Sequence, residues 1–72
     1  MGLQEAVRRV QSAGYKAIAI DDRPNLFGVY GAYAVLRDGR IEANQPLFGA
    51  GQTKEEAATR LVEHVEELTP TA

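Results

Sequence analysis

The run Arg37-Asp38-Gly39-Arg40 decides the fold, because it follows a segment rich in tyrosine, valine and phenylalanine and precedes a shorter segment that starts at Ile41 and ends at Phe48. An Asp-Gly pair in this setting predicts a β-hairpin with a two-residue type I′ turn, in which both central residues have a positive φ. The strand before the turn is expected within residues 26–37. The strand after it is expected to run from Ile41 towards Phe48. Pro46 cannot donate a ladder hydrogen bond, so this strand should end there or lie at a sheet edge.

An amphipathic helix is predicted on each side of the strands. Residues 3–13 place apolar side chains at spacings of three and four, and Gly14 follows as a typical helix-ending residue. Near the other end of the chain, Thr53 and Glu56 have the spacing of a capping box, in which the hydroxyl accepts a backbone N–H and the glutamate reaches back. The apolar stripe that follows predicts a second helix, which ends before Thr69-Pro70.

A further strand and two connections complete the predicted order. The short apolar run 17–20 predicts a strand, and residues 21–25, rich in Asp, Asn and Pro, predict a loop. Gly49-Ala50-Gly51-Gln52 is interpreted as a flexible joint between the sheet and the last helix. The expected fold is therefore α+β: a three-stranded antiparallel sheet with N- and C-terminal helices packed on one face (αβββα), in one domain of residues 1–72.

The composition narrows the functional classes. The 72 residues include no cysteine, which excludes disulfides, thiolate metal sites and cysteine nucleophiles. No apolar run approaches the roughly 18 residues of a membrane span, and the first residues lack the pattern of a signal peptide. A cytoplasmic protein without membrane contact is therefore expected. The formal net charge of −2 argues against an obligate nucleic-acid binder, which usually carries a basic excess.

The hairpin register predicts which side chains face solvent. If Arg37 pairs with Arg40, then Leu36 pairs with Ile41, and this side of the hairpin, rich in small and aliphatic residues, is assigned to the core. The opposite side is expected to be open, yet it carries more apolar surface than solubility needs. In a competing interpretation, the loop 21–27 buries Val29 and Phe48, which are part of this apolar surface. The predicted contact surface for a protein partner or a second copy consists of Val29, Tyr33, Val35, Glu42, Asn44 and Phe48.

Other reactive side chains do not predict an active site. Asp21 and Asp22, together with Glu42, could serve a metal- or anion-dependent enzyme, but adjacent aspartates at a strand end fit a turn better. His64 is the only histidine and Ser12 the only serine, and their positions do not indicate a hydrolytic triad or a metal site. The glycines before the last helix could bind an anion, but neighbouring glutamates oppose this. No enzymatic activity, cofactor or metal is predicted.

The predicted order of elements resembles the double-stranded-RNA-binding domain. In that family the last helix follows a glycine-rich stretch and begins with a Ser-Lys-Lys-x-Ala-Lys pattern. Here Thr53, Lys54 and Ala57 match, whereas Glu55 and Ala58 stand in place of lysines. The resemblance implies the fold and, as an alternative function, nucleic-acid binding through phosphate contacts from Arg8, Arg9, Lys54 and Arg60.

Two more sequence motifs, in the loop between the first two strands and at the start of the last helix, bear on the predicted function. The family's Gly-Pro-x-His signal in the loop between the first two strands corresponds to Arg23-Pro24-Asn25-Leu26, which lacks the histidine. The Gly-x-Thr-x-Glu-Glu-Ala start of the last helix is also similar to small antitoxins of the HicB type, which lack the leading helix. We expect a non-enzymatic interaction module, comparable by class alone with regulators, antitoxin-like proteins and phage-encoded inhibitors.

Overall fold

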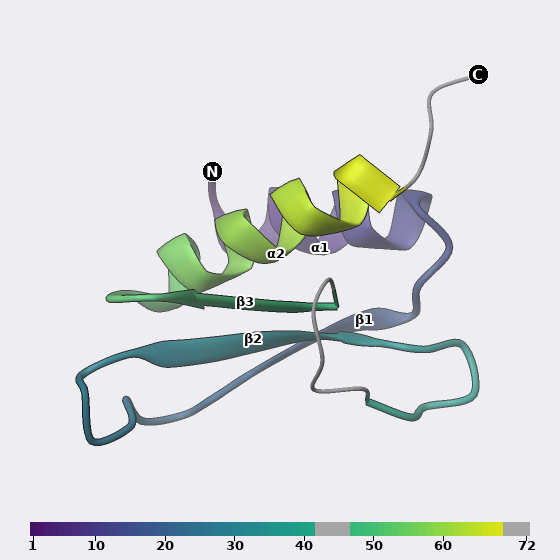
Figure 1. Cartoon of the computed structure of the whole chain (residues 1–72). Coiled ribbons are helices and arrows are strands. Elements are labelled where there is room, and N and C mark those ends of the chain that lie inside the picture. The colour runs from purple at the N-terminus through teal and green to yellow at the C-terminus, as the bar shows by residue number, and fades with distance from the viewer. Residues whose placement is uncertain (42–46, 69–72) are drawn as a thin grey trace.

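The computed structural model describes residues 1–41 and 47–68. It confirms the α+β arrangement and the αβββα order. The strands form one antiparallel sheet in the order β1-β2-β3, so that β2 is central. Figure 1 shows both helices on the same side of this sheet, with α2 directly above β3 and β2. The elements are α1 (Leu3–Ser12), β1 (Ala17–Ile20), β2 (Tyr30–Val35), β3 (Phe48–Gly51) and α2 (Lys54–Leu68).

The helix ends form as the sequence predicts. Helix α1 is closed by Gly14, whose φ of +104° is a left-handed conformation that favours glycine. At the start of α2, the Glu56 backbone N–H donates to the Thr53 hydroxyl at 3.0 Å. The Glu56 carboxylate accepts the backbone N–H of Gln52 at 3.4 Å, one residue before the expected position. These contacts satisfy backbone donors that an uncapped helix leaves unpaired.

The core between the sheet and the helices consists of small aliphatic side chains. Among the described residues, nine hydrophobic side chains are buried; five of them are alanines, none is aromatic, and Leu61 is the largest. Small side chains let the helices approach the sheet closely, but each removes little apolar surface from water. Stabilisation from this core is therefore limited for the chain by itself. The buried residues are Ala6, Val10, Ala32, Ala34, Ala57, Ala58, Leu61, Val62 and Val65.

The third strand lies later in the chain than predicted. The glycine-rich segment interpreted as a flexible joint is largely strand β3, which includes Gly49 and Gly51. Both glycines are buried against α2. A Cβ at Gly49 would lie 2.6 Å from the Ala57 carbonyl oxygen, and one at Gly51 would lie 2.7 Å from the Ala57 backbone nitrogen. The glycines are thus needed for the close approach of α2 to β3, which turn propensities do not reveal.

The hairpin turn differs from the predicted type I′ turn. Only Gly39 of the Asp-Gly pair has a positive φ, of +90°. Its N–H donates to the Leu36 carbonyl at 2.9 Å, and the Leu36 N–H donates to the Arg40 carbonyl at 2.8 Å. The loop therefore has three residues, as in a type I turn followed by a left-handed glycine. The Asp38 carboxylate stabilises this form by accepting the Arg40 backbone N–H at 3.1 Å.

The longer loop changes the register that was predicted for the hairpin. Val35, and not Leu36, pairs with Ile41, so Ile41 lies on the face opposite the helices and is half exposed, contrary to its assignment to the core. Further along, Phe48 pairs with Tyr33 and not with Val29, a shift of four residues. Because four is an even number, Phe48 and Tyr33 keep the face that was predicted for them.

Strand β2 is also shorter at its start than the predicted segment 26–37. Residues Asn25 to Gly28 form a turn in which the Gly28 N–H donates to the Asn25 carbonyl at 2.9 Å. The Asn25 side-chain oxygen accepts the N–H groups of Phe27 and Val29 at 2.9 and 3.1 Å. The hydrogen bonds to the Asn25 side chain stabilise the turn, which explains why the apolar residues after it do not join the strand.

Candidate interaction surface

The sheet presents a second, largely apolar face on the side away from both helices, which we call the outer face. Alternation along the paired strands places its side chains there, since the positions between them point into the core. Within the described residues, Asp21 is its only charged residue, and no lysine or arginine occurs on it. The outer face consists of Ala17, Ala19, Asp21, Gly31, Tyr33, Val35, Ile41, Phe48 and Ala50.

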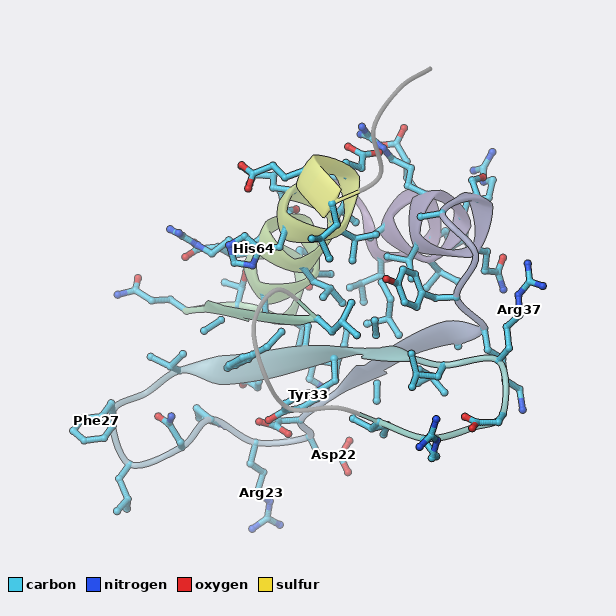
Figure 2. The ribbon with its side chains drawn as sticks, turned by 45° about the vertical axis from the view of Figure 1, so that its right-hand side comes forward. Asp22, Arg23, Phe27, Tyr33, Arg37 and His64 are labelled. Atoms are coloured by element: carbon cyan, nitrogen blue, oxygen red, sulfur yellow. The ribbon has the colours of Figure 1, made fainter. Side chains whose placement is uncertain are left out.

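An aromatic pair lies at the centre of the outer face. The rings of Tyr33 and Phe48 stack across β2 and β3, with centroids 5.3 Å apart and planes 18° from parallel. Figure 2 shows Tyr33 below the sheet, on the side away from the helices. Directly opposed residues of antiparallel strands are close enough for such a contact. The pair, which we call the Tyr33–Phe48 platform, joins the central strand and one edge strand on this face.

The platform is held in place by Asp21, which follows β1. The Asp21 carboxylate accepts the Gly31 backbone N–H at 3.1 Å and the Tyr33 hydroxyl at 3.5 Å. The Tyr33 ring crosses over Gly31, where a Cβ would lie 2.9 Å from the Asp21 carboxylate. A side chain at 31 would therefore displace the Tyr33 hydroxyl and the Asp21 carboxylate.

The pKa of Tyr33 reflects this environment. Partial burial of the phenol raises the pKa of Tyr33 above its ordinary value of 10.0, and the negative charge and hydrogen bond of Asp21 raise it further. Each cause disfavours the phenolate, which would lie in a less polar setting beside a carboxylate. Tyr33 is thus kept as a neutral hydrogen-bond donor.

The structure brings together three of the six residues predicted as a contact surface. Tyr33, Val35 and Phe48 lie on the outer face and are partly exposed. Val29 precedes β2, where its N–H and C=O both bond to Asn25, and it does not pair with Phe48 as predicted. Glu42 and Asn44 lie outside the described residues.

Two large apolar side chains protrude from the loop between β1 and β2. Relative to the fully exposed side chain, Leu26 is 101% and Phe27 is 89% exposed. Figure 2 shows Phe27 at one end of the molecule, away from the helices. The prediction placed both residues in a strand, and so did not identify them as a surface. We call this pair the Leu26–Phe27 tip.

The free edge of β3 is blocked by His64 from α2. Ala34 donates its N–H to Leu47, so alternation directs the backbone groups of Phe48 away from β2. The His64 ring nitrogen Nδ1 lies 2.8 Å from the Phe48 carbonyl oxygen, and since a carbonyl only accepts, the nitrogen donates. This contact occupies a backbone group that another strand could pair with. His64 therefore has a structural role.

The cations of the predicted phosphate-binding set lie on the helices. Arg9 of α1 forms a bidentate pair with Glu66 of α2, at 2.8 Å from Nε and 2.6 Å from a terminal nitrogen. Arg60 lies 3.7 Å from Glu56 on the same helix. Arg8 is exposed and Lys54 partly exposed. Two of the four cations are therefore next to carboxylates, which reduces the positive potential available to a phosphate.

The remaining candidates gather into no chemical site in the described part of the chain. Asp22 is exposed, whereas Asp21 is used within the sheet, so the two carboxylates do not act together. No cluster of three or more His, Asp or Glu side chains that could hold a metal ion occurs among the described residues. Neither described helix has the length and apolar character to cross a membrane.

Comparisons with known proteins add no family. No family model, curated protein or solved structure matches the chain significantly. The helix–three-strand–helix order agrees with the topology implied by the resemblance to the double-stranded-RNA-binding domain. That agreement concerns the topology alone.

Proposed function

We propose that this chain is a non-enzymatic interaction module that binds a protein surface through the outer face of its sheet. The observation that carries the proposal is the Tyr33–Phe48 stack on the face away from the helices. Apolar patches with exposed aromatics are typical of protein contact surfaces, and aromatic residues contribute strongly to binding energy there. The Tyr33 hydroxyl adds a polar group that is already oriented by Asp21.

The charge of the outer face favours a protein partner over a nucleic acid. Aromatic side chains can stack on bases, but single-strand binding also needs cations that follow the phosphates. The described part of the outer face has no lysine or arginine and one carboxylate, Asp21. An apolar contact with a second protein surface needs no such cations and tolerates a carboxylate that is already hydrogen-bonded.

A single charge on the outer face tests this proposal. Val35→Asp places a carboxylate at a partly exposed position beside the platform, where it should disrupt an apolar contact without opening the core. We expect the variant to lose protein partners captured from the native cells and to lose any self-association seen by sedimentation. Leu68→Ser, which removes a half-exposed apolar side chain from the end of α2, is the matched control. A folded Val35→Asp protein that keeps every interaction would contradict the proposal.

A titration separates the alternative function. Backbone amide resonances of the full chain are followed by NMR while a short RNA duplex is added at low salt. We expect no shifts near Arg8 or Lys54. Shifts that appear there and vanish as salt is raised would favour phosphate binding by the helices over the proposed function.

A further inference from the structure

The Leu26–Phe27 tip presents more apolar surface than any other described loop. Both side chains are essentially fully exposed, in contrast to the partly exposed aromatics of the outer face. Side chains of this size are strong anchors when a partner covers them, since an aromatic ring alone buries about 150–250 Å². Figures 1 and 2 show the loop extending from the end of the sheet, away from both helices.

The backbone below the tip is already ordered for binding. The Asn25 carbonyl accepts the Gly28 N–H at 2.9 Å, and the Asn25 N–H donates to the Val29 carbonyl at 2.8 Å. Gly28 has a φ of +74°, which completes the turn without strain. Because these bonds fix the loop before any partner arrives, little backbone entropy remains to be lost on binding.

The charges beside the tip fit a second copy of the same loop. Asp22 and Arg23 are adjacent and exposed, so the loop carries one charge of each sign. In a dimer with two-fold symmetry, Arg23 of one copy can pair with Asp22 of the other. The symmetry repeats this contact, so two equivalent ion pairs form. An anionic membrane or a nucleic acid would instead favour an excess of cations.

The contact area also points to a second copy that uses both surfaces. Each neighbouring pair of strands is paired over five residues. With a rise of about 3.3 Å per residue along the strand and a spacing of about 4.8 Å between strands, the three strands give the outer face an area of about 240 Å². Two copies joined by this face alone would bury about 500 Å², well below the roughly 1,000 Å² expected of a specific interface. Adding about 300 Å² from each tip brings the total to about 1,100 Å².

We infer that the occupant of the outer face is a second copy of this chain, with the Leu26–Phe27 tip of each copy packed on the Tyr33–Phe48 platform of the other. This inference rests on the proposed function, since it names the partner of the same face. It also accounts for the exposure of Phe27 and the partial exposure of Tyr33 and Phe48 in a single copy. These three side chains are buried between copies, where they add apolar contact to the small core of the monomer.

Sedimentation equilibrium of the full chain tests the inference. The wild type is expected to pass from its monomer mass of 7.8 kDa to twice that mass as concentration rises. Phe27→Ser should raise the dissociation constant by about tenfold or more, as loss of an aromatic anchor does. The change lies on a fully solvated side chain, so folding is preserved. Leu68→Ser should leave the dissociation constant within about twofold, as expected outside an interface.

The other outcomes separate this inference from the proposed function. A wild type that stays monomeric up to about 1 mM, a concentration at which even weak specific contacts form, overturns the second copy, while a protein partner lost with Val35→Asp would still support the outer face. A dimer weakened by Val35→Asp but not by Phe27→Ser overturns the role of the tip alone. A dimer unaffected by both variants overturns the inference, and it also overturns the proposed function if Val35→Asp keeps every captured protein partner. A monomer that binds phosphatidylcholine–phosphatidylglycerol vesicles through Phe27 overturns the inference in favour of a lipid surface.

Discussion

Replacing Gly49 by alanine should strongly destabilise the fold. An added Cβ would lie 2.6 Å from the Ala57 carbonyl oxygen and 2.8 Å from the Leu61 Cα, and it would also approach the Leu61 backbone nitrogen. These neighbours are backbone atoms of α2, so no side-chain rotation can relieve the clash. The helix and β3 must separate by about 0.8 Å at the Ala57 carbonyl, from 2.6 Å to the 3.4 Å of an ordinary contact.

The expected cost follows from that separation. A gap of 0.5–1 Å loses about a quarter to a half of the dispersion energy between the surfaces, and overpacking of this kind costs about 1–3 kcal/mol. We expect about 2–3 kcal/mol, within that range, because rigid backbone is displaced on both sides. A 72-residue domain has only about 4–10 kcal/mol of stability, and its Tm falls by about 4–8 °C per kcal/mol. The variant should therefore melt about 10–20 °C below the wild type.

Thermal and urea unfolding, followed by far-UV circular dichroism at one fixed protein concentration, measure this effect. Gly2→Ala is the matched control, because it is the same substitution at a site where the added Cβ meets no atom within 4 Å and φ is −77°, and its cost should stay within about 1 kcal/mol. Without a clash, Gly49→Ala would stabilise the strand by about 0.5–1 kcal/mol. A Tm at or above that of the wild type would therefore refute the close-packing argument.

Two further predictions concern polar contacts. Because the pKa of Tyr33 is raised, the free energy of unfolding should fall as pH rises above about 10, where the unfolded chain ionises first. Asp21→Asn should bring the pKa of Tyr33 back towards 10.0, as measured by phenolate absorbance, and an unchanged value would contradict the role given to Asp21. His64→Ala should cost about 1 kcal/mol in urea unfolding, by removing the bond to the Phe48 carbonyl, and a loss near zero would show that this bond is dispensable.

The sequence was sufficient for the elements whose signals are local. The apolar stripe and Gly14 predict α1, and the Thr53–Glu56 spacing predicts the start of α2, because capping depends on residues within one turn. The facing of Tyr33 and Phe48 was also predicted correctly, although the register that led to it was wrong by four residues.

The features that were missed depend on contacts between distant segments. Gly49 and Gly51 have the composition of a loop, and only the nearness of α2 makes them a strand. The Asp-Gly pair is compatible with two- and three-residue loops, so it does not fix the position of Ile41. The Leu26–Phe27 tip has a local signal, an asparagine before it and a glycine after it, but its apolar composition favoured a strand.

Isotope-filtered NMR on a mixture of labelled and unlabelled full-length chains tests the central claim most directly. Only contacts between different copies give cross-peaks in that experiment. The dimer that we infer predicts cross-peaks from the Phe27 ring of one copy to the Tyr33 and Phe48 rings of the other. Cross-peaks confined to residues of α1 and α2, or none in a sample concentrated enough to sediment as a dimer, would contradict binding through the outer face.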